Sequence, residues 1–269
     1  MSAGSATALE AILASTREHL AHEQQRRPLA QLLSAARQAP AVRPLIEELS
    51  RPGRINVIAE HKRRSPSRGA IREDLAPGDV ARRYELAGAA ALSVLTERDF
   101  FGGSLAHLAE ARANASLPLL RKDFLLEPWQ VWEARAAGAD AVLLIVAALE
   151  DAQLSELLSV VAETGMAALV EVHERRELER ALRAGARLVG VNNRDLRTLA
   201  VSLSTSLELL PLVPDEVVAV AESGIRSGRD LRRLREAGFD AFLVGESLMS
   251  APCPGEALRQ LMREAEVAA

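Results

Sequence analysis

The sequence predicts an α/β protein, a (β/α)8 TIM barrel with an N-terminal helical extension. Eight short apolar runs recur on the order of 25 residues apart, which is the length of one strand–helix unit. Nearly every run ends on a polar or charged residue, and barrel enzymes display their active sites at the carboxyl ends of their strands. The runs are Ile55–Ala59, Ala91–Leu95, Pro118–Leu120, Ala141–Leu149, Ala167–Val170, Leu188–Val191, Val217–Ala221 and Ala241–Val244.

Residues 1–54 are predicted to form helices that pack on the barrel. Leu9, Ile12, Leu13 and Leu20 recur at helical spacing, and a second apolar face begins after Pro28. Prolines and Pro52-Gly53 then break the pattern before the first strand. The extension is too short and too polar for a core of its own, so we expect a single domain in which 55–269 form the barrel.

The remaining elements alternate between strand and helix. A run that is apolar on both faces suits a parallel strand covered by barrel core on one side and by helices on the other. Each of four Gly residues lies where a helix would end in a left-handed turn before the next apolar run. These stop signals are Leu86–Ala89, Ala136–Ala139, Arg183–Ala186 and Glu236–Phe239.

An open, doubly wound sheet is the main structural alternative. Such a sheet normally concentrates its ligand residues at one switch point. Here polar residues follow at least six strands, and only a closed ring of strands would bring them together. The sequence therefore favours the barrel.

Composition narrows the functional class. The 269 residues are 48% hydrophobic with a net charge of −4, so we expect neither a nucleic-acid nor a membrane partner. The longest apolar stretch is far shorter than the ~20 residues that cross a bilayer. No basic segment leads into an apolar one at the N-terminus, and Cys253 is the single cysteine. A cytoplasmic enzyme is the expectation.

Charged side chains at the strand ends indicate acid–base chemistry. Glu60 and Lys62 are two positions apart and should share a face, although an ion pair that merely closes the barrel would also explain them. Lys122 ends the third strand, where burial would lower its pKa towards neutrality. Glu171 has apolar neighbours that should raise its pKa. Further polar tips are Asn192, Arg194 and Glu222.

The last two strand ends predict a phosphate site. Ser223-Gly224 and Gly245-Glu246-Ser247 place small residues where the loops after strands seven and eight commonly bind phosphate through backbone N–H groups. Either glycine alone would fit an ordinary turn. We expect no metal, because the histidines lack ligand spacing, and no cofactor, because no Gly-rich nucleotide fingerprint follows the first strand.

Four segments resemble those of the indole-3-glycerol phosphate synthase family. They are Ile58–Ser67, Leu120–Phe124, Val191–Leu196 and Ala221–Ile225, and the resemblance extends from the N-terminal helix to Met249. It implies a lyase of tryptophan biosynthesis that closes the indole ring of 1-(2-carboxyphenylamino)-1-deoxyribulose 5-phosphate with loss of carbon dioxide and water. It also allows association with other enzymes of that pathway.

The resemblance implies a role for each matching residue. Lys122 would be the general acid, Glu171 its partner in dehydration, and Lys62 the contact to the substrate carboxylate. Glu60, Asn192 and Glu222 would position the lysines and the substrate hydroxyls, and Arg194 would lie near Glu60. The remaining residues would bind substrate: Ser65, Ser223, Gly224, Gly245, Glu246 and Ser247 around the phosphate, with any Glu246 carboxylate pointing away from it, and Phe101 and Phe124 against the aromatic ring.

Two other functions fit the barrel less well. A sugar-phosphate isomerase such as phosphoribosylanthranilate isomerase would need a cysteine or aspartate acid–base pair at the strand ends, whereas Cys253 lies beyond the eighth strand. A non-catalytic phosphate sensor would need the glycines but neither Lys122 nor Glu171. A turnover assay separates all three.

Overall fold

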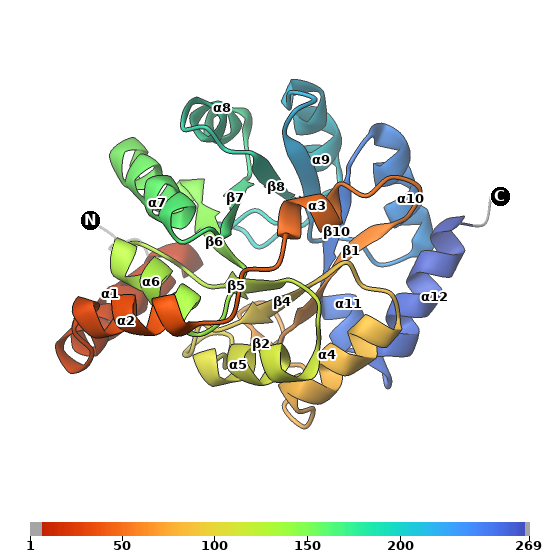
Figure 1. Ribbon diagram of the computed structural model, residues 1–269. Coiled ribbons are helices and arrows are strands. Elements are labelled where there is room, and N and C mark those ends of the chain that lie inside the picture. The colour runs from red at the N-terminus through yellow and green to blue at the C-terminus, as the bar shows by residue number, and fades with distance from the viewer. Residues whose placement is uncertain (1–6, 267–269) are drawn as a thin grey trace, which may run out of the picture.

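The computed structural model describes residues 7–266, so the outermost positions of the two predicted ranges lie outside the described residues. Eight parallel strands close into a barrel, in the order β1-β10-β9-β8-β7-β6-β5-β4 (Figure 1). The predicted fold class is confirmed. The barrel strands are β1 (Asn56–His61), β4 (Ala91–Leu95), β5 (Leu119–Lys122), β6 (Ala141–Ile145), β7 (Ala167–Val172), β8 (Leu188–Asn192), β9 (Val218–Glu222) and β10 (Ala241–Val244).

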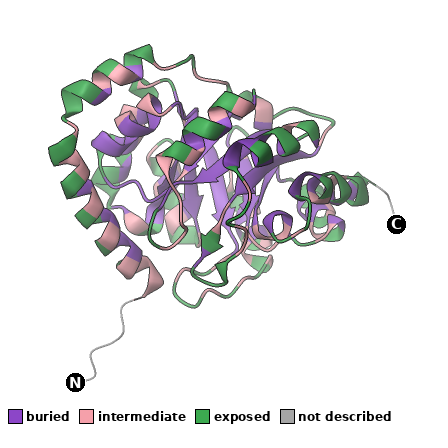
Figure 2. Ribbon diagram, turned by 90° about the horizontal axis from the view of Figure 1, so that it is seen from below, coloured by how far each residue is buried: buried purple, intermediate pink, exposed green. Residues whose placement is uncertain are grey.

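Helices surround the strands and cover the outer face of the barrel (Figures 1 and 2). Their inward faces bury aliphatic side chains against the strands, and their exposed faces carry most of the charge. These helices are α4 (Pro77–Leu86), α5 (Leu105–Asn114), α6 (Pro128–Ala136), α7 (Asp151–Glu163), α8 (Arg175–Arg183), α9 (Ser204–Leu209), α10 (Gly228–Ala237), α11 (Glu246–Met249) and α12 (Pro254–Glu266).

The N-terminal extension contains α1 (Ala8–Arg26), α2 (Leu29–Gln38) and α3 (Leu45–Leu49). Leu20 and Leu32 bury against Trp129 of α6, whose indole Nε1 donates a hydrogen bond to the Arg27 carbonyl at 3.1 Å. Both predicted helices are present. The short α3, between Pro44 and Pro52, was not predicted, because five residues are too few to show a periodic pattern.

Several strand boundaries differ from the apolar runs, because backbone pairing rather than apolarity decides where a strand ends. β7 continues through Glu171 to Val172, since Glu171 pairs with Gly190 and Val172 with Val191. β6 ends at Ile145, and the apolar run continues as a 3-10 turn over Val146–Ala148. A small hairpin, β2 (Arg64–Ser65) with β3 (Gly69–Ala70), follows β1 and was not predicted.

The helix stop signals adopt the predicted left-handed conformation. Their φ angles are 92°, 88°, 87° and 115° at Gly88, Gly138, Gly185 and Gly238. A side chain with a Cβ would adopt this conformation only at a cost. These turns return the chain to the barrel four times.

The strand register brings the polar tips together at one end of the barrel. Glu60 of β1 lies beside Ser93, Glu171 of β7 beside Gly190, and Asn192 of β8 beside Glu222. Buried strands fill the centre of the molecule (Figure 2). The carboxylates are therefore inside the barrel mouth, with apolar core beneath them.

Candidate active site

Glu60 and Lys62 share the inner face of the barrel, as the two-residue spacing predicts. Lys62 Nζ lies 2.8 Å from Glu60 Oε1, and Ser93 Oγ donates a 3.3 Å hydrogen bond to the other carboxylate oxygen. Burial alone would raise the pKa of Glu60, but the charges of Lys62 and Lys122 outweigh it and lower that pKa. Glu60 therefore stays ionised and holds Lys62.

Lys122 is the centre of the site. Its Nζ lies 3.3 Å from Glu171 Oε2 and 3.2 Å from Glu222 Oε2. Burial lowers the pKa of Lys122, yet the charges of Glu222, Glu171 and Glu60 more than offset this and raise the pKa above its ordinary value. The predicted shift towards neutrality is wrong, because three carboxylates surround the ammonium and favour its charged form.

Glu171 also ionises differently from its prediction. Burial raises its pKa, but the Lys122 charge, His173 and the Asn192 amide lower it further than burial raises it. The sequence neighbours of Glu171 are apolar, as expected, but its spatial neighbours are cations and donors. The predicted rise in pKa is therefore wrong.

Glu222 is the carboxyl whose pKa does rise. Burial raises the pKa of Glu222 to about 8, and the nearby Glu171 charge adds to the effect against the attraction of Lys122. Neither of its carboxylate oxygens has an aligned hydrogen-bond partner among the described residues. Glu222 therefore shares the ammonium of Lys122 with Glu171 and carries a proton near neutral pH.

Asn192 and Arg194 complete the ring of polar groups after β8. Asn192 Oδ1 accepts a 3.0 Å hydrogen bond from the backbone N–H of Arg194, which shapes the turn. Arg194 lines the same pocket as Glu60, but its ion pair is with Glu246, at 3.5 Å. Arg194 therefore lies near Glu60, as the resemblance implies, but its charge is paired with Glu246.

Gly224, Gly245, Ser223 and Ser247 line one pocket of about 460 Å³ that opens beside Glu60 and Lys62. Ser223 and Gly224 have φ angles of 63° and 82°, so the chain turns sharply as it leaves β9. Gly245 precedes α11, whose first N–H groups have no partners within the helix. The Ser247 hydroxyl donates to the Ile225 carbonyl at 3.1 Å, so this donor is used within the protein.

Glu246 bridges two arginines at the rim of this pocket. Its Oε1 lies 3.3 Å from Arg68 Nη1, and its Oε2 lies 3.5 Å from Arg194 Nη2. Arg68 also donates a 3.0 Å hydrogen bond to the Ser250 hydroxyl. The Glu246 carboxylate thus pairs with Arg68 and Arg194, the guanidinium groups that an incoming anion would contact.

We call the pocket lined by Gly224 and Gly245 the anion pocket. An apolar pocket adjoins it, and Lys62, Arg194 and Glu246 line both. The rings of Phe101 and Phe124 stand there with centroids 6.4 Å apart and planes tilted by 36°. Leu9 and Ile12 of α1 line the same pocket, as does Ser65. Ser65 therefore lies in the apolar pocket and not among the residues that line the anion pocket, in contrast to its predicted place.

Four residues of the site were missed by sequence reasoning. Arg68 and Arg226 line the anion pocket, and His173 contacts Glu171. Gly190 lies against Glu222, so close that a Cβ at position 190 would overlap that carboxyl group. The arginines directly follow quoted motifs and could have been noticed. No local pattern marks Gly190, because its partner Glu222 is on another strand. The partners of His173 are near it in the sequence, at Glu171 and Glu177, so the spacing of these three residues was a signal that could have been noticed.

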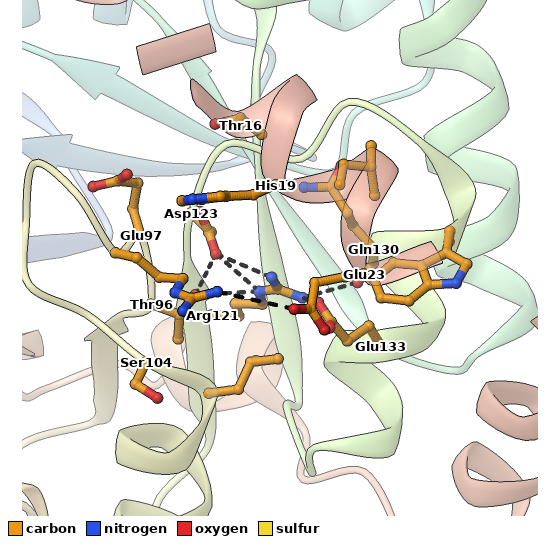
Figure 3. A pocket seen from close by; sticks show the side chains of 14 residues that line it. Thr16, His19, Glu23, Thr96, Glu97, Ser104, Arg121, Asp123, Gln130 and Glu133 are labelled. Carbon is orange, nitrogen blue, oxygen red and sulfur yellow. Dashed lines mark hydrogen bonds and ion pairs between the residues drawn. The ribbon is translucent and has the colours of Figure 1, made fainter. Parts of the chain in front are cut away.

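A second polar pocket, of about 250 Å³, lies outside the barrel mouth between α1, α6 and the segment after β4. Figure 3 shows Arg121 at its centre, between Asp123 and Glu133. The Arg121 guanidinium also donates to Thr96 and to the Gln130 carbonyl, so its donors are used within the protein. This pocket ties the extension to the barrel, and its central guanidinium, that of Arg121, is not free to bind a phosphate.

Residues 7–266 contain neither a metal-binding cluster nor a membrane-spanning helix. No group of three or more His, Cys, Asp or Glu side chains there could hold a metal ion. No helix in that part of the chain is long and apolar enough to cross a membrane.

The arrangement places acid–base groups between a polar pocket lined by glycines and arginines and an apolar pocket walled by two phenylalanines. Lys62 and Lys122 are the chain's only two lysines, and both point into the mouth beside three carboxylates. The anion pocket would hold a phosphate on one side, and the phenylalanines would hold an aromatic ring on the other. Proton transfer to oxygen and from carbon is the chemistry that such groups perform.

Comparison with known proteins points in the same direction. A family model described as indole-3-glycerol phosphate synthase matches residues 9–261. A protein of that name from Aromatoleum aromaticum is 50% identical over 256 residues, which cover 94% of this chain and 98% of the relative. Another of that name, from Carboxydothermus hydrogenoformans, is 52% identical over 211 residues and covers 78% and 80%.

Solved structures of low identity share the barrel fold. A mandelate oxidase variant has a TM-score of 0.60 at 21% identity, covering 88% of this chain and 84% of its own. A thiamine phosphate pyrophosphorylase from Pyrococcus furiosus has a TM-score of 0.60 at 17% identity, covering 83% and 98%. At these identities the likeness concerns the fold alone.

Proposed function

The chain belongs to the indole-3-glycerol phosphate synthase family, and we propose that the lysines and carboxylates of its barrel mouth carry out the reaction of that family. Membership makes it a carbon–carbon lyase of tryptophan biosynthesis, which forms indole-3-glycerol phosphate with loss of carbon dioxide and water. The observation that carries the residue assignment is Lys122, which contacts two buried carboxylates within 3.3 Å between an anion pocket and an aromatic wall.

Binding would hold the two ends of the substrate apart. The phosphate would lie against Gly224, Gly245 and the start of α11, where backbone N–H groups and Arg226 are positive. The carboxyphenyl ring would pack against the wall that Phe101 and Phe124 form, with its carboxylate near Lys62. Binding energy from the remote phosphate then orients the reacting carbons.

Ring closure needs a proton at the carbonyl oxygen of the sugar chain. The ring carbon that bears the carboxylate attacks the C2 carbonyl carbon, and Lys122 would protonate the oxygen to a hydroxyl. Loss of carbon dioxide returns its electron pair to the ring. Lys122 then assists departure of the hydroxyl as water, while Glu171 would take the C1 proton that completes the indole.

Glu222 would supply the lysine with protons. A lysine whose pKa is raised is a weak acid. The carbonyl oxygen that receives its proton, however, becomes strongly basic as the carbonyl carbon is attacked. The Glu222 carboxyl, with its pKa raised to about 8, lies 3.2 Å from Nζ and would return the proton. Glu171 stays ionised and would act as the base.

Several broader features belong to the same proposal. Residues 1–54 would act with 55–269 as a single domain, because Leu9 and Ile12 of the extension line the apolar pocket. We place the activity in the cytoplasm, with a small phosphorylated molecule as its substrate. Association with other enzymes of the tryptophan pathway would appear as co-elution of the purified proteins in gel filtration.

A turnover assay tests the function directly. Purified protein is incubated with 1-(2-carboxyphenylamino)-1-deoxyribulose 5-phosphate, and indole fluorescence is followed together with carbon dioxide release. We expect one carbon dioxide for each indole formed. Recovery of unchanged or merely isomerised substrate would contradict the proposal.

A further inference from the structure

His173 and Glu177 form a buried pair directly behind Glu171. His173 Nε2 lies 3.3 Å from Glu171 Oε1, and its Nδ1 lies 3.1 Å from Glu177 Oε2. That Glu177 oxygen also accepts a 2.7 Å hydrogen bond from the His173 backbone N–H. The three side chains are 2%, 12% and 14% exposed, from Glu171 outward to Glu177. The pair therefore links a buried carboxylate to the start of α8.

We propose that His173, held by Glu177, is a positioning residue that keeps Glu171 a carboxylate and aims it at Lys122. The inference rests on the proposed function, in which Glu171 is the base of the dehydration. His173 would not touch the substrate, since Glu171 lies between it and Lys122. Its effect would pass through Glu171.

The different surroundings of Glu171 and Glu222 support this role. Both carboxylates contact the one ammonium of Lys122, at 3.3 and 3.2 Å. Within residues 7–266, Lys122 is the one cation at ion-pair distance from Glu222, whereas Glu171 also contacts His173. A carboxylate with opposite charge within about 4–6 Å is stabilised in its ionised form. The imidazole thus decides which of the two carboxyl groups remains a base.

Glu177 makes this cation stable. Burial lowers the pKa of His173, but its contacts with Glu171 and Glu177 outweigh burial and raise the pKa to about 10. His173 is then an imidazolium throughout the range in which Glu171 could titrate. Glu177 is needed to keep His173 charged, because the other carboxylate that contacts the imidazole, Glu171, also contacts the ammonium of Lys122.

Other charged groups lie near the pair. Glu171 faces Lys122 on β5 and, across that ammonium, Glu222 on β9. The groove outside His173 and Glu177 contains Glu174, Arg176, Arg180, Asp195 and Arg197. All of these groups are unchanged in every variant below, so a shift between the profiles does not come from a change in any of them.

The test compares pH profiles of the single-turnover rate constant at saturating enzyme. His173→Gln keeps a polar side chain but removes the charge. We expect the acid limb of its profile to move to higher pH by at least about one unit, the shift that a lost neighbouring charge produces. The rate on the plateau above that limb should fall less than in a Glu171→Gln variant.

Two matched variants keep the test decisive. Glu177→Gln leaves His173 in place and should move the acid limb in the same direction by a smaller amount. Glu179→Gln makes the same change two residues along α8 at an exposed position, and should leave the profile unchanged. Circular dichroism and thermal melts establish that each variant is folded.

An unchanged acid limb in His173→Gln and Glu177→Gln would overturn the proposal, as would a loss of rate of the same factor at every pH. The proposed function fails separately, when the unmodified protein forms no indole product. If the unmodified protein turns over normally and only the limb does not move, the assignment of His173 alone is wrong.

Discussion

The carboxyl group of Glu222 on β9 fills the space that a side chain at Gly190 on β8 would need. A Cβ built at position 190 would overlap Glu222 Oε1, and it would also stand 3.2 Å from Leu169 Cδ1. The missing side chain therefore sets the place of the carboxyl group that contacts Lys122 at 3.2 Å. A residue without a side chain thereby limits where the Glu222 carboxyl group can lie.

Gly190→Ala should lower kcat by displacing the Glu222 carboxyl from Lys122, with a smaller effect on KM. A double-mutant cycle with Glu222→Asp tests the cause, because the shorter side chain makes room for the new methyl group. We expect the double variant to be no slower than Gly190→Ala alone. Strictly additive losses would show that the glycine acts elsewhere in the barrel.

Lys122→Met should reduce the single-turnover rate constant by at least ~10², the factor typical of a lost general acid. Glu171 and Glu222 lose their shared cation, so both become easier to protonate and the barrel can still fold. Rapid-quench measurements of product, with circular dichroism of the variant, check both statements. A near-normal rate constant would mean that another group supplies the proton.

Lys62→Met should raise KM as well as lower kcat, because Lys62 would bind the substrate carboxylate in the ground state. Only two lysines occur in the chain, so ¹⁵N spectra of labelled side-chain amines contain two Nζ signals, which this variant assigns. The signal that remains, from Lys122, should titrate only above the ordinary lysine range. Titration of that signal near neutrality would contradict the ion cluster described above.

Glu246→Gln should tighten the binding of inorganic phosphate and lower KM. The carboxylate bridges Arg68 and Arg194 and must release them when an anion arrives. Exposed ion pairs contribute up to about 1 kcal/mol, so the gain should be about two- to five-fold and should shrink at high salt. Isothermal titration with phosphate measures it. Glu256→Gln, on the exposed face of α12, is the control, and weaker binding in Glu246→Gln would oppose this interpretation.

His61→Phe should make the protein less sensitive to acid. Burial, followed by the nearby His107 and Arg63, lowers the pKa of His61 to about 4. The unfolded chain binds a proton near pH 6.5 while the folded chain does not, so this contribution to stability is present above pH 6.5 and is lost as the pH falls through 4. Urea unfolding at pH 7 and pH 4.5 should show a smaller drop in the variant. His22→Phe, at an exposed position, should behave like the unmodified protein.

Gly245 lies against Glu60 as well as lining the anion pocket. The sequence predicts it as a point of close approach for phosphate, and it does line the anion pocket. A Cβ at this position would also stand 2.9 Å from Glu60 Cβ and would overlap the Glu60 carboxylate. A bulky residue at 245 would therefore disturb Glu60 and Lys62 as well, so a raised KM in such a variant would not by itself locate the phosphate.

The amino-acid sequence by itself determined the barrel and the end at which chemistry occurs. Apolar runs such as Ala91–Leu95 specify strands that are buried on both faces, and turn glycines such as Gly88 end the helices between them. These signals are local, because periodicity and backbone conformation depend on near neighbours in the chain. Parallel strands then place residues such as Glu60 and Glu222 at one rim without further information.

Only the tertiary structure decided how the gathered groups ionise and which of them pair. Lys122 and Glu171 are 49 positions apart, and the burial expected at their strand ends predicted pKa shifts opposite to those that the cluster produces. An ionisation equilibrium depends on distances of a few ångströms between charges from different strands. His173 and Glu171 are only two positions apart, yet their spacing alone does not show that the two side chains meet. The space that Gly190 leaves to Glu222 exists only once β8 and β9 lie side by side in the barrel.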